Sequence, residues 1–541
     1  MLMTRLLTVL LFTGAVFAQQ ATLDAMRKAS TFYADKVSTH GGYHYYYTED
    51  LSYGRSEHGE GSTQVETQRE ATPRVAMAYL EAFDATGDRF YLEAARKAAH
   101  ALVEGQLCSG GWDYLIEFDS AKRGKYPYRN GGDCSIQNPP TTLDDNVTQA
   151  CVRVLMRVDR ALGQSDAAIH EAAMFTLASL LKAQYPNGAW PQRYSKFPNP
   201  ADYPVKKASY PESWSRKWPG ENYRNHYTFN DNTISDGIDM MLEAGAIYND
   251  ARYTASAKKG GDFILLAQMP EPQPAWAQQY DADMHPAWAR VFEPPSVTGG
   301  ESQGVIATLL VLYRETGERK YLAAAKPALE YLERSVLPKP SGSPSEIRRR
   351  AGEPALARFY ELKTNRPLYI TKGTEIRAKG LGSIRPDGYQ ISYTDESVIT
   401  HYAVVTSGKG LGALRKEYER VAAADPATLR RAAKLHGLSP WSRDAEPPAR
   451  KPTVARVDEL ISSLDARGAW TEEGQIGKAD NVVSVFAARE MLLTINGKPL
   501  PIHENDRIDL YDGTQPPRTR IIRSSRFADN LEALAASVAR R

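Results

Sequence analysis

A helical segment with one apolar face recurs along this chain, each time after a short turn. In the copy that begins at residue 86, Leu92, Ala95, Ala99 and Leu102 follow one another at the three- and four-residue spacing of a helix. Related copies cover 162–181, 249–258 and 316–326. Because such repetition is the signature of a fold built from repeated units, these copies constrain the architecture more than any single motif does.

A second helical pattern precedes each copy, so the repeating unit is a helix hairpin. The preceding patterns cover 73–83, 149–162, 235–248 and 305–315. A single hairpin cannot bury its apolar face alone, so neighbouring hairpins must stack or close into a ring. We therefore expect a mainly α protein: an (α/α) toroid-like barrel of hairpins with long loops and a small β or irregular portion. An open helical solenoid is the alternative.

Less regular sequence follows the hairpins. Strands are expected at 367–370, 389–393, 401–405, 482–486 and 491–495, and a closing helix at 527–538. The stretch 440–452 is rich in proline and charge, which is typical of a linker. We divide the chain into a signal peptide (1–18), the helical domain (19–420), a linker (421–455) and a C-terminal accessory segment of unknown role (456–541).

The N-terminal end has the pattern of an export signal. An apolar run over 6–17 follows Arg5 and ends at small residues, and it is too short to span a membrane. We therefore expect a periplasmic or secreted protein with no membrane span. Since export permits disulfides, Cys108 and Cys134, both in loop-like sequence, are expected to pair, and Cys151 is expected to be a buried thiol.

The charge balance narrows the choice of partners. The chain has 67 Lys and Arg against 65 Asp and Glu, a formal net charge of +2. A nearly neutral chain without a basic run is unlike a protein whose main partner is nucleic acid. We expect a monomer that does not bind nucleic acid.

The repeat also predicts where chemistry could occur. Loops that enter the first helix of successive hairpins lie at one end of the array, and they contain Asp144-Asp145-Asn146, Asn230-Asp231-Asn232, and then Arg290, Glu293 and Glu301. Asp and Asn are also preferred helix N-caps, so the alternative is that each of these Asp and Asn residues only caps a helix. Carboxylate and amide oxygens suit Ca²⁺, and arginine suits carboxylates, so together they indicate a polyuronic acid ligand.

Several motifs resemble the pectate lyases of polysaccharide lyase family 10. They lie at 142–148, 185–192, 228–232, 288–296 and 357–367, and the resemblance covers about residues 70 to 380. It implies a toroid-type helical domain, in agreement with the repeat. It also implies cleavage of polygalacturonate or pectin by Ca²⁺-dependent β-elimination.

The resemblance assigns roles to particular residues. Asp144 matches the aspartate that holds Ca²⁺, although a shift of one position would select Asp145, and Asp231 matches a second site aspartate. Arg290 matches the arginine proposed as the base, for which an ion pair with Glu293 is the alternative. For the substrate we expect Arg358, Lys372 in place of a family arginine, and Trp190, Trp288, Glu301 and Asp231.

Two other functions are compatible with the same residues. An inverting glycosidase would use Asp145 with Asp231 or Glu301 as acid and base, about 6.5–9.5 Å apart. A non-catalytic polyuronate-binding protein would use the groove for binding alone. The tryptophans could likewise pack between hairpins instead of stacking on sugars.

Overall fold

The computed structural model describes residues 18–220, 223, 226–338, 353–371, 376–378, 382–384, 389–395, 398–399, 402–429, 451–476, 482–486, 491–495, 498–502, 507–511 and 518–539. Residues 1–17 of the predicted signal peptide lie outside this set. So do Lys372 and the linker stretch 430–450. Among the described helices, none combines the length and the apolar character that crossing a membrane would need.

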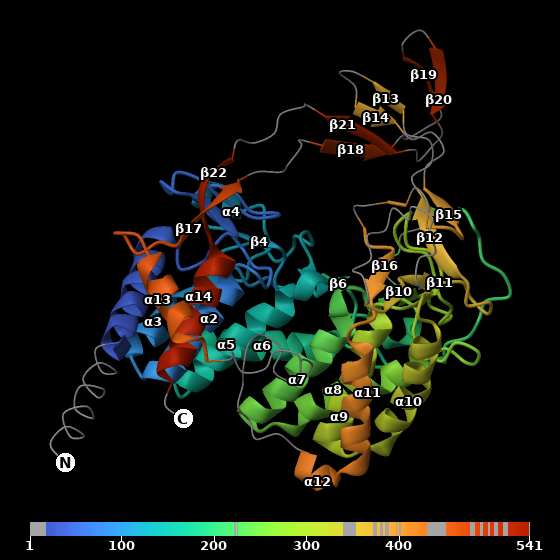
Figure 1. The fold of residues 1–541 in the computed structure, drawn as a ribbon, viewed down its shortest axis with the longest axis horizontal. Coiled ribbons are helices and arrows are strands. Elements are labelled where there is room, and N and C mark those ends of the chain that lie inside the picture. Colours follow the sequence, from blue (N-terminus) through green and yellow to red (C-terminus); the bar gives the residue numbers. More distant parts are fainter. Residues whose placement is uncertain are drawn as a thin grey trace.

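Four helix hairpins form the body of the protein, as the repeat predicts (Figure 1). They are α2 (Thr72–Thr86) with α3 (Arg89–Glu104), α5 (Val147–Ala161) with α6 (Ala167–Ala183), α7 (Thr233–Tyr248) with α8 (Ala251–Ala267), and α9 (Glu301–Thr316) with α10 (Arg319–Arg334). The short helices α4 (Ser120–Arg123), α11 (Leu411–Ala423) and α12 (Pro426–Leu429) accompany them. The mainly helical fold of repeated hairpins is confirmed.

The second helices of three of the four hairpins begin in the same way, and α10, which follows Glu318, lacks this side-chain cap. The carboxylates of Asp88, Asp166 and Asp250 accept hydrogen bonds from the backbone N–H groups of the first helical turns of α3, α6 and α8. Such N-caps satisfy donors that the helix itself leaves unpaired. On α3, Leu92 and Leu102 are buried, as the predicted apolar stripe requires.

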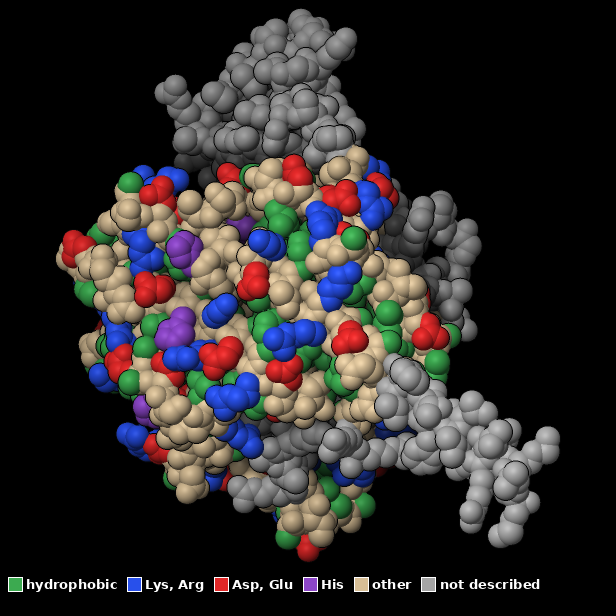
Figure 2. All heavy atoms as spheres, turned by 90° about the vertical axis from the view of Figure 1, so that its left-hand side faces the viewer, with side chains coloured by type: hydrophobic (Ala, Val, Ile, Leu, Met, Phe, Trp, Pro, Cys, Tyr) green, Lys and Arg blue, Asp and Glu red, His purple; other side chains and the backbone are tan. Residues whose placement is uncertain are grey.

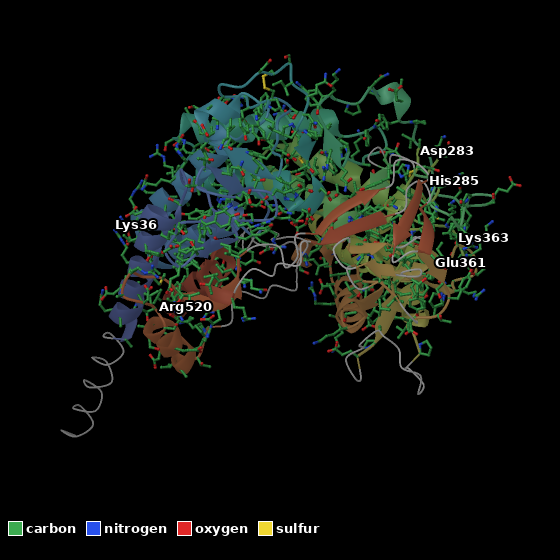
Figure 3. The ribbon with its side chains drawn as sticks, turned by 90° about the horizontal axis from the view of Figure 1, so that it is seen from above. Lys36, Asp283, His285, Glu361, Lys363 and Arg520 are labelled. Atoms are coloured by element: carbon green, nitrogen blue, oxygen red, sulfur yellow. A yellow bond between two sulfur atoms is a disulfide. The ribbon has the colours of Figure 1, made fainter. Side chains whose placement is uncertain are left out.

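The hairpins stack in sequence order along an open arc. In the view from above, the chain curves from the N-terminal hairpin to α10, and α10 and α11 lie apart from α13 (Val454–Ser462) and α14 (Ser524–Val538) at the other end (Figures 1 and 3). The barrel is therefore not closed in this structure. Its concave side is still formed by helices that occupy equivalent places in successive repeats.

Identical contacts join the end of one hairpin to the next. The indole N–H of each repeat tryptophan donates to a carbonyl in its own second helix: Trp112 to Leu102, Trp190 to Leu180, Trp276 to Ile264, at 2.8–3.1 Å. Glutamine side chains then reach the next hairpin's second helix, from Gln106 to Ala172, Gln184 to Ser256 and Gln268 to Ala324, at 2.8–3.0 Å. These contacts fix the spacing between units.

Glycine is required where these loops pass close to the next helix. Gly188 has φ +100°, and a Cβ atom there would lie 2.0 Å from the backbone oxygen of Lys259 in α8. Only glycine combines a left-handed backbone with so close an approach.

Both ends of the described chain meet beside α2. Tyr33, after the helical segment 18–32, stacks on Phe527 of α14 with ring centroids 3.8 Å apart, and α14 packs against α2. Trp470 repeats the indole contact, donating to Leu460 of α13. A four-stranded sheet has the order β17 (Thr471–Gln475), β22 (Arg518–Arg523), β1 (Tyr46–Thr48), β2 (Gly54–Arg55). These parts of the C-terminal segment therefore pack on the N-terminal hairpin.

Short sheets form within the loops that connect the helices. One has the order β15 (Gln390–Ser392), β12 (Pro367–Thr371), β11 (Phe359–Tyr360), β9 (Val297–Thr298), and a second pairs β10 (Ala355–Ala357) with β16 (Val405–Ser407). Two-stranded pairs are β3 (Gln64–Glu66) with β4 (Leu115–Glu117), β5 (Thr141–Thr142) with β6 (Arg193–Tyr194), and β7 (Tyr227–Thr228) with β8 (Gln279–Tyr280). The remaining strands are β13 (Ile376–Ala378), β14 (Gly382–Ile384), β18 (Val482–Phe486), β19 (Met491–Ile495), β20 (Lys498–Ile502) and β21 (Arg507–Tyr511).

The cysteines agree with the sequence analysis. Cys108 and Cys134 form a disulfide, and Cys151 is a buried thiol, as predicted. On the face shown in Figure 2, basic and acidic side chains are interspersed, with no area of a single sign.

Replacing Trp190 tests whether the indole contacts hold the hairpins together. Trp190 is fully buried, so Trp190→Ala is expected to lower the free energy of unfolding by about 3–5 kcal/mol, measured by urea denaturation. Phe197→Ala is the control, since Phe197 is 45% exposed, and it should cost no more than about 0.5 kcal/mol. A Trp190→Ala variant as stable as the parent would contradict the packing role.

Candidate active site

Two equivalent turns place the acidic residues. The turn Asp144–Asn146 precedes α5, and the turn Asn230–Asn232 precedes α7. Asp145 and Asp231 both have φ +49°, and the asparagine that follows each is also left-handed. Asp and Asn tolerate this backbone better than other residues with a side chain do. Asp145 is thus the structural equivalent of Asp231, and Asp144 the equivalent of Asn230.

These side chains do not serve as helix caps. The residues at the N-cap positions of α5 and α7 are Asn146 and Asn232, and neither makes a capping hydrogen bond through its side chain. The alternative that the Asp and Asn residues are present to cap helices is therefore not supported. Their carboxylates are turned instead toward one another.

Three carboxylates converge at this point. One oxygen each of Asp144, Asp145 and Asp231 lies within 4.8 Å of the others. Asp144 accepts hydrogen bonds from Gln192 at 2.9 Å and from Arg193 at 3.1 Å. The Tyr114 hydroxyl lies 3.1 Å from both Asp144 and Asp145. Three hard oxygen donors from two loops are the kind of ligand set that Ca²⁺ takes.

The gathered negative charge alters the protonation of the cluster. Loss of hydration, followed by the charges of Asp144 and Asp145, raises the pKa of Asp231 to about 7. Loss of hydration and the charge of Asp144 also raise the pKa of Asp145. Since like charges at this distance repel, the cluster is suited to a cation that would compensate them.

A cleft of about 270 Å³ contains the carboxylates and Arg290 together. It is lined by Glu57, Asp144, Asp145, Gln192, Tyr223, Thr228, Asn230, Asp231, Gln278, Gln279, Ala289, Arg290, Glu293 and Tyr402. Residues from three consecutive repeats thus share one space, which the sequence analysis requires. The cleft is polar, and its lining includes both acidic residues and an arginine.

Arg290 is held by Glu293 in a two-pronged ion pair. Its Nε and Nη2 donate to the two Glu293 oxygens at 2.8 and 2.6 Å, and its backbone N–H donates to Oε2 at 3.0 Å. Burial favours a neutral Arg290, but the hydrogen bonds and charge of Glu293 outweigh it and raise the pKa of Arg290 further above its usual range. The ion pair considered as an alternative is therefore present.

Arg358 reaches the same region from the loop between β10 and β11. Its Nη2 donates to Glu301 at 2.5 Å and lies 3.4 Å from the side-chain oxygen of Asn230. Glu301 is thus paired with Arg358. Lys372, the other predicted cation, lies outside the described residues.

The two predicted substrate tryptophans are not available to a sugar, so this part of the prediction is wrong. Trp190 is fully buried between hairpins, where its ring contacts Gly237 and Gly260. Trp288 is 8% exposed and donates its indole N–H to the Ser215 carbonyl. Both rings stabilise loops that form the cleft, and neither presents an open face.

Several residues of the site were not predicted from the sequence. Glu57, Gln192 and Tyr402 line the cleft, and Gln68, Tyr114 and Arg193 donate hydrogen bonds to its aspartates. Gln192 is the last residue of the motif at 185–192 and Arg193 follows it, so the motif itself offered a signal. Glu57, Gln68 and Tyr402 come from loops that the repeat does not place, and the sequence contained no signal for them.

A sequence model of pectic acid lyases matches residues 119–396, more than half of the chain. The chain belongs to the pectic acid lyase family. Every site residue predicted from the sequence falls within the matched region. Glu57, Gln68, Tyr114 and Tyr402 fall outside it, so this lyase family member builds part of its cleft from segments beyond the family region.

Among solved structures, the protein is similar to a family 10 polysaccharide lyase from Cellvibrio cellulosa, with 22% identity, a TM-score of 0.42, and coverage of 66% of this chain and 99% of that one. A variant of that lyase was solved with trigalacturonic acid. A cellobiose 2-epimerase from Spirochaeta thermophila DSM 6192 has 16% identity and a TM-score of 0.38, with coverage of 59% of this chain and 71% of that one. No curated protein sequence matches the chain.

Removing the charge of Asp231 should stabilise the cation-free lyase. Its folded pKa of about 7 lies above the ordinary 3.8, so the charged form is disfavoured by folding, and stability is lost as pH rises from about 4 to about 7, with the full loss present above that. In chelator, Asp231→Asn should therefore unfold a few degrees higher than the parent at about pH 8, with a smaller difference at about pH 5. Differential scanning calorimetry would measure this.

Asp283→Asn is the control for this measurement. Asp283 lies at the outer edge of the molecule (Figure 3), where a hydrogen bond from Lys206 lowers its pKa. Its replacement should give no gain in stability. If both variants, or neither, gained stability at the higher pH, charge repulsion in the cluster would not be the cause.

Proposed function

We propose that this protein cleaves polygalacturonate by Ca²⁺-dependent β-elimination. The observation that carries the proposal is the convergence of Asp144, Asp145 and Asp231 in one cleft with Arg290, in a chain of the pectic acid lyase family. Carboxylates that can hold a cation and an arginine that can bind an anion are both needed for a negatively charged sugar. A neutral polysaccharide would use neither.

The three aspartates would hold the cation. Bound there, Ca²⁺ would neutralise the uronate carboxylate and so make the neighbouring C5 proton easier to remove. Gln192, Arg193, Tyr114 and Gln68 donate to two of these carboxylates and fix their orientation. Preorganised ligands of this kind lower the cost of binding, because little has to move when the ion arrives.

Arg290 is the proposed base, and Arg358 binds a substrate carboxylate. Abstraction of the C5 proton requires an arginine nitrogen without its proton, whereas Glu293 favours the protonated form. The neutral population is therefore small at ordinary pH and grows as the pH rises. Elimination then breaks the bond between C4 and the glycosidic oxygen and leaves a double bond between C4 and C5.

The alternative of an inverting glycosidase is less well supported. Such enzymes separate their two carboxyl groups by about 6.5–9.5 Å to admit a water molecule. Oxygens of Asp145 and Asp231 lie within 4.8 Å of each other, which is shorter. A cation site accounts better for three carboxylates gathered this closely.

We also propose that the protein is exported and acts as a monomer outside the cytoplasm. The apolar run at 6–17 supports export. The disulfide between Cys108 and Cys134 supports it as well, because such bonds persist mainly in oxidising compartments.

Polygalacturonate with and without Ca²⁺ provides the direct test. The lyase should generate unsaturated products that absorb in the near ultraviolet, and chelator should abolish the signal until Ca²⁺ is restored. The signal should depend on the cation because the three aspartates repel one another without it. Activity that persists in chelator and yields saturated ends would refute the elimination and favour a hydrolase.

Arg290→Ala tests the assignment of the base. Loss of a general base should lower kcat by about 10²–10⁴-fold. Binding of trigalacturonate, measured by calorimetry, should weaken much less than turnover does, because Arg358 and the cation site are retained. Arg252→Ala is a matched control, since the Arg252 side chain is 73% exposed and pairs only with the nearby Asp250 among the described residues. Equal turnover in both variants would exclude Arg290 as the base.

A further inference from the structure

Tyr402 contacts two arginines, Arg290 in the cleft and Arg358 beside it. The Arg358 guanidinium carbon is 4.2 Å from the centre of the Tyr402 ring, and that of Arg290 is 5.0 Å from it. Tyr402 lines the cleft but lies beyond residue 396, where the family match ends. One aromatic ring therefore contacts both arginines that have a role in the proposed function.

The hydroxyl of Tyr402 is tied to the same network. It donates to Glu293 Oε1 at 2.7 Å, the oxygen that also accepts from Arg290 Nη2 at 2.6 Å. Each arginine is consequently held by a carboxylate and by the ring: Arg290 by Glu293 and Tyr402, and Arg358 by Glu301 and Tyr402. Glu293 and Glu301 are themselves almost fully buried, so they provide rigid supports.

This arrangement controls how close two like charges lie. Guanidinium groups repel one another, and the electron-rich face of a tyrosine attracts both. Glu301 engages Nη2 of Arg358, and Glu293 engages Nε and Nη2 of Arg290. An arginine carries five N–H donors, so each retains donors for an additional carboxylate.

We propose that Tyr402 is a positioning residue whose ring sets the spacing and orientation of Arg290 and Arg358, so that the pair recognises the carboxylates of a polyuronate. This inference rests on the proposed function and adds a residue from outside the family region. The ring carries the role, because both cation contacts are made with its face. The hydroxyl is secondary, since Glu293 already holds Arg290 through three hydrogen bonds.

Two substitutions separate the ring from the hydroxyl. Tyr402→Phe keeps the aromatic face, so KM for polygalacturonate and the Kd for trigalacturonate should stay within about twofold of the parent. Tyr402→Leu removes the face, and both constants should rise about 5- to 30-fold, as expected for the loss of one or two cation–π contacts. The Ca²⁺ concentration that gives half-maximal activity should not change, because within the described chain the Tyr402 hydroxyl bonds to Gln278 and Glu293 and its ring contacts the two arginines, not the three aspartates.

Tyr389→Leu is the matched control. Tyr389 packs edge-on against Phe292, 5.6 Å away, in the aromatic cluster that also contains Tyr402. Its replacement should leave KM and Kd near those of the parent, and thermal unfolding should show that all variants remain folded.

Three results would overturn the inference. One is a Tyr402→Leu variant with the parent's KM and Kd. Another is a Tyr402→Phe variant as impaired as Tyr402→Leu, which would assign the effect to the hydroxyl. The third is a change in Ca²⁺ dependence as large as the change in KM, which would indicate collapse of the whole cleft. Absence of lyase activity in the parent would instead refute the proposed function, and trigalacturonate binding would still test the role of Tyr402.

Discussion

The site depends on how each hairpin is fastened to the next. An indole N–H closes the ends of α3, α6 and α8, and a glutamine from the same loop reaches across to the next hairpin's second helix. These contacts repeat at equivalent positions, so successive units keep the same offset. The loops that enter the first helices are consequently brought to a common rim, where residues distant in sequence share one cleft.

At that rim, the fold loses some stability because it gathers like charges in the proposed binding site. Three carboxylates within 4.8 Å of one another raise the pKa of Asp231 to about 7, which shows that the folded chain disfavours its charge. Left-handed turns hold these side chains together against their repulsion. The charges of the two arginines, in contrast, are compensated, because each arginine pairs with a buried glutamate. The uncompensated aspartates support the proposed cation site, and the compensated arginines support the proposed recognition of an anionic sugar.

The hairpins and the rim residues could be predicted from the sequence because both follow from a repeated pattern. Apolar spacing fixed the helices, and equivalence between repeats placed Asp145 and Asp231 together. Exposure of Trp190 and Trp288 could not be predicted, since the sequence does not say which face of a ring another hairpin covers. Tyr402 and Glu57 were missed because they reach the cleft through loops without repeat equivalents. Open or closed stacking likewise depends on small offsets that no motif specifies.

The stacking of Tyr33 on Phe527 has a consequence for biogenesis. These residues are almost five hundred positions apart, so the first-made segment cannot complete its packing until the last helix has been synthesised. Pairing across so long a separation is slow to form, since the entropy of closing the loop is lost before any contact compensates it. A newly made chain would therefore keep its leading end unpaired for most of its synthesis. That delay is compatible with the proposed export, in which the chain crosses a membrane before it folds.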